Sequence, residues 1–578
     1  MDARATAQGS GAGASRGVRW ALAALVGLAL LAQVFAAFRS GIHWDEFAQL
    51  HQADWTLANG ELESGGRPGL ATLMLLPLVK GCADEIAVVR RARLLWVGIT
   101  ALFLAGLWSW AREFRGDWRD GAVAVALLGL VPAFLDASVQ IRTDQIALAG
   151  GAWGGALLLA SRRRPWLALL AGLCFGVGLL GSQKLLYLGV LAGLLAAGQV
   201  CWTHELRPRR EALRALLCGA TMALVLLGFA LAMRAAFGAA ESGAAQAPVS
   251  REIVTGGLSR FAFYRGTIGW SQYREILPTL AAHGLLLLAL AIATLRARRA
   301  APEQRVPLAL AWLLLLLGTA VLYFHAAAFA YFWMTLGVFP ALAFALARPS
   351  LEALGDALPR RAGRLALAGT ALLLALPALL GLASRAVDAQ AVQRESLHFV
   401  HQNFERDAAG FHPERALFCQ EGAQPRITWF SQHIYHRFGQ DEAMRNYHTR
   451  QLLQTFREQP LLFVVQSFRL NQFPAEVRRF WTDNYQPYRA SVFVAGRRLA
   501  GARGERREFD LVAPGAYRWL PLAEPRSVSI DGQLVRPGEV RRFEPGTHEA
   551  SFVEDVDAGL LVLALEEPPG EAPLRFYR

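Results

Sequence analysis

Two neighbouring carboxylates, Asp45 and Glu46, follow the first long apolar run of the chain, in the motif GIHWDEF at residues 41–47. Carboxylates next to lipid are costly unless they carry out chemistry or form pairs. A second polar site, with Arg142 and Asp144, lies in a short connection between later apolar runs. A carboxylate within hydrogen-bond reach of a hydroxyl can act as a general base. The two loops therefore predict an active site at one face of a membrane.

The composition is that of an integral membrane protein. Of 578 residues, 54% are hydrophobic, and the mean hydropathy is +0.28. Runs of roughly 20 apolar residues recur along the first two thirds of the chain, as transmembrane helices require. A net charge of +13 could suit a nucleic acid, but the excess arginines gather in short connections, where the positive-inside rule places them. Nucleic-acid binding is therefore not expected.

The apolar runs predict about eleven transmembrane helices within residues 1–385. They cover residues 20–38, 94–110, 121–135, 146–160, 166–181, 185–202, 213–234, 276–295, 306–324, 329–347 and 365–383. Alternate connections are rich in arginine and should be cytoplasmic, whereas those that carry Asp45 and Asp144 should lie outside. The first run is too long for a signal peptide and lacks a clear cleavage site, so it is read as a retained helix.

A soluble domain is expected from about residue 386. Residues 386–505 indicate an α/β domain, with strands at 415–420, 461–466 and 490–495 and a helix at 474–485. Residues 506–578 show short strands punctuated by turns such as Asp531-Gly532, which predicts a small β-rich sandwich or barrel. The expected fold class is thus an α-helical polytopic membrane protein with a C-terminal α/β plus β-rich soluble domain, which lies outside.

The first outer connection, residues 39–91, is too long for a simple link between adjacent helices. It should contain a helix at 47–57, a turn at Arg67, and an apolar stretch at 70–79 that is too short to span a bilayer. Short apolar stretches of this kind lie along the membrane interface or re-enter it. The carboxylates of this connection are therefore well placed to act on a lipid headgroup.

Several of these features occur together in one group of enzymes. They are the acidic pair Asp45-Glu46 after the first span, the Arg67-Pro68 turn, the Arg93-Leu94 start of the second span, Asp144 at the start of the fourth, and an aromatic-rich penultimate span at 331–340. In these features, and in topology over roughly residues 18–385, the chain resembles the GT-C glycosyltransferases that include protein O-mannosyltransferases and lipid A aminoarabinose transferases. The C-terminal domain differs from that of the O-mannosyltransferases.

The resemblance implies transfer of a monosaccharide from a polyprenyl-phosphate donor to a lipid, glycan or protein acceptor, with inversion. The site would lie at the outer face of a bacterial inner membrane. The C-terminal domain would be periplasmic, where it would either bind or gate the acceptor or only stabilise the loops above the site. Asp45 would be the catalytic base, and Glu46 would orient the acceptor or a metal. The cations suited to the donor phosphate are Arg67, Arg93, Arg142, Lys184 and the arginines within residues 251–274. The other substrate-binding residues would be Asp144 and His325.

No cofactor is assigned, and a divalent cation is left open. The spacing of His43 and His51 matches no strong zinc signature, so no metal ligand is predicted. Cys82 and Cys419 would share the outer compartment, which leaves a disulfide between them open.

Each candidate also has a plainer interpretation. Asp45 and Glu46 could be a solvated loop pair in which Glu46 caps the following helix, and Asp144 could cap the fourth span. Arg142 could pair with Asp136 or Asp144. Lys184, Arg93 and His325 could be ordinary interfacial residues beside lipid headgroups.

Two other functions compete with the transferase. A flippase for a lipid-linked sugar would place polar groups near mid-membrane and contain internal repeats, whereas here the ionisable residues lie at the outer ends of spans. A non-catalytic envelope assembly protein would tolerate the loss of Asp45.

Overall fold

The structure is a computed structural model. It describes residues 27, 30–31, 33–62, 69–129, 132–203, 207–237, 284, 287–297, 304–324, 333–356, 388–422, 442–570 and 576. Of the predicted features, Arg67, His325, the span at 365–383 and the arginines of residues 251–274 lie outside the described residues.

The chain forms two compact units. The helical unit comprises Met1–Arg39, Trp55–Pro77 and Arg90–Val387, and the sheet unit comprises Ser40–Asp54, Leu78–Val89 and Asp388–Arg578. Two pieces of the first outer connection thus belong to the same unit as the C-terminal domain. The domain limits drawn from the sequence, at 385/386 and 505/506, stay predictions.

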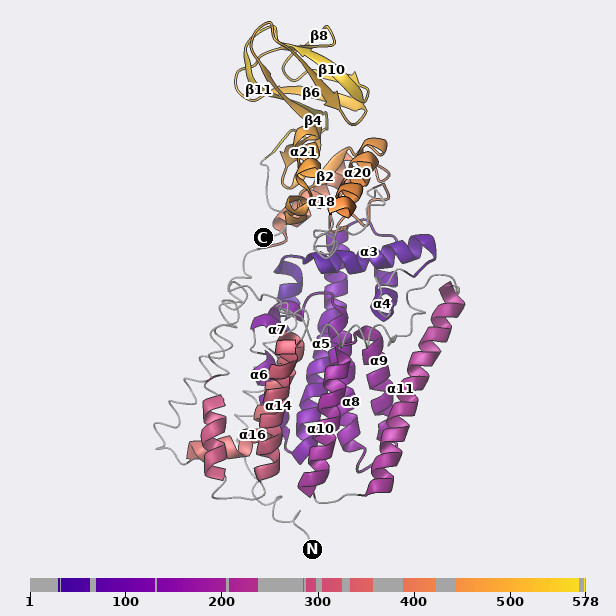
Figure 1. Ribbon diagram of the computed structural model, residues 1–578, viewed down its shortest axis with the longest axis vertical. Helices are drawn as coiled ribbons and strands as arrows, with labels where there is room; N and C mark the ends of the chain where they lie inside the picture. The colour runs from indigo at the N-terminus through magenta and orange to yellow at the C-terminus, as the bar shows by residue number, and fades with distance from the viewer. Residues whose placement is uncertain are drawn as a thin grey trace. The chain divides into compact units, whose positions relative to one another are not determined.

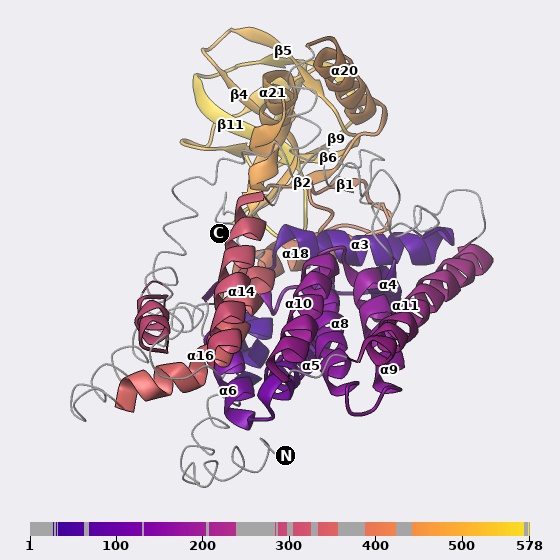
Figure 2. The ribbon, with the colours of Figure 1, turned by 60° about the horizontal axis from the view of Figure 1, so that its bottom comes forward.

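The helical unit is built from helices (Figures 1 and 2). Its described elements are α4 (Leu70–Val79), the main part of α5 (Glu85–Arg115), α6 (Trp118–Gly129), α7 (Pro132–Ala137), α8 (Thr143–Ala160), α9 (Leu167–Gly181), α10 (Leu185–Thr203), α11 (Pro208–Phe237), α14 (Arg305–Phe324), α15 (Trp333–Leu336) and α16 (Val338–Asp356). Over the described residues, four helices are long and apolar enough to cross a membrane. The predicted class, helical with apolar spans and a C-terminal sheet domain, is confirmed.

The run at 121–135 corresponds, over its described residues, to α6 and α7, and residues 130–131 lie outside the described part of the chain. In the run at 329–347, Gly337 forms a turn between α15 and α16. Met334–Leu354 is one of the four helices that are long and apolar enough to cross a membrane.

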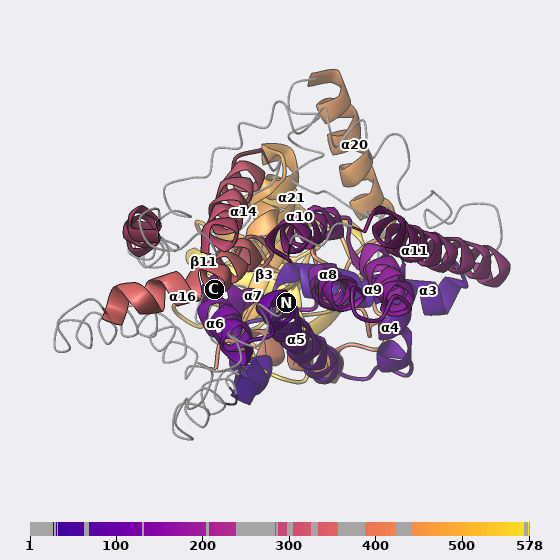
Figure 3. The same cartoon turned by 90° about the horizontal axis from the view of Figure 1, so that it is seen from below.

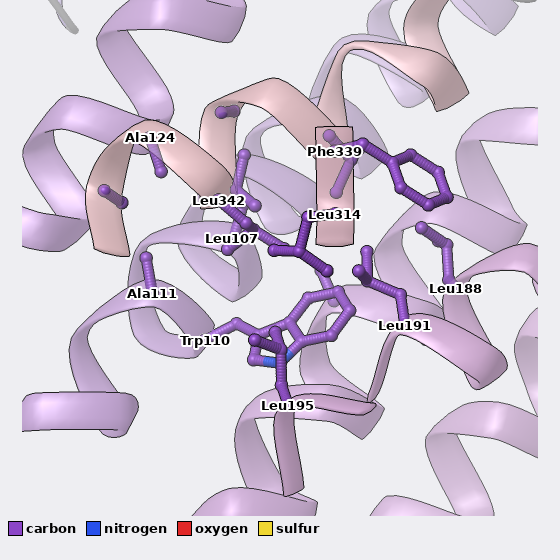
Figure 4. Packing of buried hydrophobic residues seen from close by; sticks show 14 of the residues in the cluster. Leu107, Trp110, Ala111, Ala124, Leu188, Leu191, Leu195, Leu314, Phe339 and Leu342 are labelled. Atoms are coloured by element: carbon purple, nitrogen blue, oxygen red, sulfur yellow. The ribbon is translucent and has the colours of Figure 1, made fainter. Parts of the chain in front are cut away.

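Close approach of helices builds the core of the helical unit. Helix α8 packs against both α9 and α10 (Figure 3). A Cβ on Gly155 of α8 would lie 2.3 Å from the ring of Trp110, so only glycine fits there. Trp110 is fully buried beside Leu191 and Leu195 (Figure 4). Small residues at such contacts are typical of helices that pack in membranes.

A buried ionic network joins α5, α6 and α16. Arg115 donates to both carboxylate oxygens of Asp120 at 2.6 and 3.0 Å, and Arg348 donates to Oδ1 of the same carboxylate at 2.7 Å. Arg115 also donates to the carbonyls of Ala345 and Leu346 at 2.6 and 2.7 Å. Buried charges require such partners, so this network fixes which helices meet.

The sheet unit contains helices α18 (Ala391–Asn403), α20 (Glu442–Glu458) and α21 (Ala475–Asn484). Its strands are β1 (Gly410–Phe411), β2 (Phe463–Val465), β3 (Tyr485–Arg489), β4 (Val492–Gly501), β5 (Arg506–Leu511), β6 (Gly515–Pro521), β7 (Val528–Ile530), β8 (Gln533–Val535), β9 (Val540–Phe543), β10 (Gly546–Ser551) and β11 (Val556–Leu563). Over the described residues, one sheet has the order β1-β2-β4-β11-β6-β9 with β3 also paired to β4, and a second has the order β5-β10-β7-β8. Strand β4 pairs with β2, β3 and β11, so hydrogen bonds cross the predicted limit at 505/506.

Local predictions in this unit had mixed outcomes. The strands at 461–466 and 490–495 and the helix at 474–485 are confirmed as β2, β4 and α21. Asp531 and Gly532 both have positive φ and link β7 to β8 as a two-residue hairpin, as such sequences favour. The predicted strand at 415–420 is wrong. Nδ1 of His412 accepts the N–H groups of Glu414 and Ala416 at 3.1 and 3.4 Å, so the chain curls around this side chain.

Candidate functional site

In the helical unit, Asp144 and Lys184 form an ion pair. Nζ of Lys184 lies 2.7 Å from Oδ2 of Asp144, and Oγ of Ser182 donates to Oδ1 at 3.1 Å. The side chain of Lys184 is 18% exposed, and that of Asp144 is 8% exposed. The carboxylate in the first turn of α8 therefore holds the connection between α9 and α10, and it positions the ammonium group.

Arg142 and Arg93 are also buried in this unit. The guanidinium of Arg142 donates to Oε1 of Gln140 at 2.9 Å, while its carbonyl accepts Nε1–H of Trp96 at 2.7 Å. Arg93, on α5, is fully buried and donates to the carbonyl of Ala37 at 3.3 Å. Both arginines thus lie inside the protein, where ionisable side chains usually serve a site or a pair.

Two further polar groups near Arg142 were not anticipated from the sequence. The amide nitrogen of Gln145 donates to the carbonyls of Ala137 and Gln140 at 3.0 and 2.8 Å. Within the described part of the chain, Oε1 of Gln145 and Oγ of Ser138 are buried without a hydrogen-bond partner. A buried polar atom without a partner costs about 1–3 kcal/mol, so these atoms suit a polar ligand group. A lone glutamine after an acidic residue gives no signal of this in the sequence.

Replacing Lys184 with glutamine should destabilise the helical unit by about 3–5 kcal/mol, because it leaves the buried Asp144 carboxylate without its cation. The double variant Asp144→Asn/Lys184→Gln should recover most of that loss, because two neutral amides replace the charged pair. Thermal unfolding of the purified full chain in detergent measures both. Equal losses in the single and double variants would show that the pair is not coupled.

In the sheet unit, the acidic pair lies in the first turn of helix α3 (Trp44–Asn59). The predicted helix at 47–57 therefore begins three residues earlier than expected. Oε2 of Glu46 accepts the N–H of His43 at 2.8 Å, and Nδ1 of His43 accepts the N–H of Asp45 at 3.2 Å. These reciprocal bonds form a capping box, and negative charge is favoured at a helix N-terminus. Glu46 thus caps α3, as its plainer interpretation expected, but it is buried and not part of a solvated loop.

The two carboxylates of the pair have different surroundings. Glu46 is fully buried, whereas the side chain of Asp45 is 17% exposed and its Oδ2 lies 3.7 Å from Nδ1 of His43. A buried capping carboxylate has little freedom to move, and it fixes the backbone that carries its neighbour. Asp45 is thus the more exposed member of the pair.

A second cluster in the sheet unit surrounds Glu85. Its Oε2 lies 2.6 Å from Nε2 of His401, and its Oε1 accepts the N–H of Cys419 at 3.2 Å. Cys419 forms a disulfide with Cys82, which the sequence had left open. Burial lowers the pKa of His401, but the hydrogen bond and charge of Glu85 outweigh it and raise that pKa overall. The cluster joins residues 78–89 to the C-terminal domain.

Among the described residues, no three His, Cys, Asp or Glu side chains are grouped so as to hold a metal ion. His51, on α3, is buried, and burial together with the nearby Arg415 lowers its pKa to about 3. It is therefore a neutral packing residue of α3 at physiological pH.

Asp54 gives the sheet unit a pH-dependent stability. Burial, with the charges of Glu85 and Glu421, raises its pKa from 3.8 to about 6. The unfolded chain therefore releases this proton at lower pH than the folded chain, and stability falls as pH rises from about 3.8 to about 6. Asp54→Asn should raise stability at pH 7.5 by about 1 kcal/mol, a value reduced for solvent screening. Thermal unfolding at pH 7.5 and 5 should show a smaller gain at pH 5, and an equal gain would exclude this cause.

These features define a helical membrane protein with a C-terminal sheet-containing domain. No protein-family model and no curated protein matches the sequence. Similar solved structures are the oligosaccharyltransferase of Archaeoglobus fulgidus with zinc and sulfate, and ArnT of Cupriavidus metallidurans in its apo state and bound to undecaprenyl phosphate.

The likeness to these structures is distant. The oligosaccharyltransferase is 14% identical, with 80% of this chain and 72% of that chain covered and a TM-score of 0.45. Apo ArnT is 15% identical, with 70% and 85% covered and a TM-score of 0.46. Bound ArnT is 16% identical, with 69% and 84% covered and a TM-score of 0.31. Such values assign no role to any residue of this chain.

Proposed function

We propose that this protein transfers a monosaccharide, with inversion, from a polyprenyl-phosphate-linked donor to an envelope acceptor at the outer face of a bacterial inner membrane. The observation that carries the proposal is the difference within the acidic pair. Glu46 is fully buried as a helix cap, and Asp45 beside it is partly exposed. A fixed, reachable carboxylate is what a general base requires.

In this mechanism Asp45 accepts the proton of the acceptor hydroxyl as that oxygen attacks the anomeric carbon. The bond between the anomeric carbon and the phosphate oxygen breaks, and the electron pair leaves with the polyprenyl phosphate. Attack opposite the leaving group inverts the anomeric centre. Glu46, expected from the sequence to orient the acceptor or a metal, is proposed instead to position Asp45 through the helix cap.

The leaving phosphate needs cationic partners, because its negative charge increases as the bond breaks. Lys184, Arg142 and Arg93 are the described candidates, and the burial of their side chains strengthens such contacts. Arg67 and His325 stay predictions for the same role. If Lys184 binds the phosphate, the Asp144→Asn/Lys184→Gln variant, which keeps the fold, should raise KM for the donor about tenfold or more, the usual scale for a charge-assisted hydrogen bond.

The test is mass spectrometry of envelope lipids and glycans from cells with the native chain, without it, and with Asp45→Asn. Asp483→Asn, at an exposed aspartate of the same unit, is the matched control. Loss of one sugar modification in the deletion and in Asp45→Asn alike, with the protein still in the membrane, supports the transferase. If Asp45→Asn behaves as native while the deletion does not, a flippase or an assembly protein becomes the better explanation.

A further inference from the structure

Residues 40–42, which lead into the acidic pair, are held by side chains of the C-terminal domain. The amide of Gln393, on α18, accepts the N–H of Ile42 at 2.9 Å and donates to the carbonyl of Ile42 at 2.9 Å. Gln390, at the start of the same helix, donates to the carbonyl of Ser40 at 2.9 Å. Both glutamines are buried: Gln390 is 0% exposed and Gln393 is 1% exposed.

These side chains bind the backbone N–H and C=O groups of a segment that belongs to no helix or strand. Residues 41–43 form neither helix nor strand, and Ile42 is buried. Buried backbone N–H and C=O groups need partners. A carboxamide carries one acceptor and two donors in nearly the geometry of a peptide group, so Gln393 can bind both groups of Ile42 at once. An aliphatic side chain of similar size would bind neither.

The anchor is directly connected to the catalytic candidate. Ile42 is followed by His43, whose N–H is bound by Glu46 and whose Nδ1 accepts the N–H of Asp45. The contacts therefore run without interruption from α18 through Ile42 and His43 to Asp45. Displacing a reacting group by about 1 Å can lower a rate about 100-fold, so the position of Ile42 matters for any chemistry at Asp45.

We propose that Gln393 is a positioning residue for Asp45, with Gln390 in a lesser role. The C-terminal domain then takes part in the reaction by holding Ile42, 351 residues earlier in the chain than Gln393, and so fixing the geometry of the base. This inference rests on the proposed function, because it takes Asp45 as the group that accepts the proton.

The experiment uses the purified full-length protein and three variants on or beside α18. Gln393→Leu removes both bonds to Ile42, and Gln390→Leu removes the bond to Ser40. Gln402→Leu changes an exposed glutamine of the same helix and is the matched control. Gln393→Leu should lower kcat about 10- to 100-fold with little change in KM for the donor. Gln390→Leu should cause a smaller loss, and Gln402→Leu none.

Hydrogen exchange of the backbone amides provides a readout that does not depend on activity. The amides of residues 42–46 should exchange about tenfold faster in Gln393→Leu and at the native rate in Gln402→Leu. Native exchange together with native kcat in Gln393→Leu would overturn the anchor, and so would a lower kcat without faster exchange. If Gln393→Leu fails to fold, the milder Gln390→Leu decides by the same two measurements. If Asp45→Asn keeps its activity while exchange still responds to Gln393→Leu, the proposed function fails and the anchor remains.

Discussion

Replacing Asp45 with asparagine should lower kcat for sugar transfer about 1000-fold, within the range expected when a general base is lost. Asparagine keeps the shape of the side chain but accepts no proton, and it leaves the helix cap formed by Glu46 and His43 in place. The loss should therefore be in kcat and not in the amount or stability of the protein. Initial rates of the purified full chain with a polyprenyl-phosphate donor give the measurement.

Two variants distinguish the base from its support. Asp45→Glu keeps a carboxylate but shifts it by about one bond, so it should retain more activity than Asp45→Asn. Glu46→Gln keeps a weaker acceptor for the N–H of His43, so it should lower kcat less than Asp45→Asn and also lower stability by about 1 kcal/mol, the usual size of a capping effect. A larger loss in Glu46→Gln than in Asp45→Asn would reverse the two roles.

Removing the disulfide should have a large effect on stability. Cys82→Ser should destabilise the sheet unit by about 2–5 kcal/mol, because the bond closes a loop of 337 residues that an unfolded chain would otherwise leave free. The bond also adjoins Glu85, which binds both Cys419 N–H and His401. Thermal unfolding of the full chain with and without reductant measures the effect.

The control for this experiment is Cys201→Ser, which removes an exposed free thiol. It should leave the unfolding temperature and its response to reductant unchanged. If reductant lowers the unfolding temperature of Cys82→Ser as much as that of the native chain, the stabilisation does not come from the disulfide.

Much of the fold was predictable because its signals are local. The apolar stretch at 70–79 is helix α4 with the predicted bounds, and the turn at Asp531-Gly532 has the positive φ angles that its sequence favours. Even the helix cap was within reach, since Glu46 stands three residues after His43, as in a capping box. By contrast, residues 415–420 have strand-like composition, but a buried His412 bends the backbone there.

The contacts that organise the candidate site could not be predicted from the sequence. Gln393 and Ile42 are 351 residues apart, and Glu85 and His401 are 316 apart. Neither pair has a motif, because a glutamine that binds backbone or a histidine that binds a carboxylate needs no fixed spacing. Asp144 and Lys184 were both proposed for the site, but their pairing across 40 residues depends on how α8, α9 and α10 pack.

The ionic network of α5, α6 and α16 also constrains the order of events during synthesis. Arg115 and Asp120 are five residues apart and can meet as soon as they leave the ribosome, whereas Arg348 is 228 residues further along. At translation rates of about 5–20 residues per second, Asp120 waits roughly 11–46 s for its second arginine. The early pair thus gives this buried carboxylate a cation while the later spans are made, and the arrival of α16 completes the network.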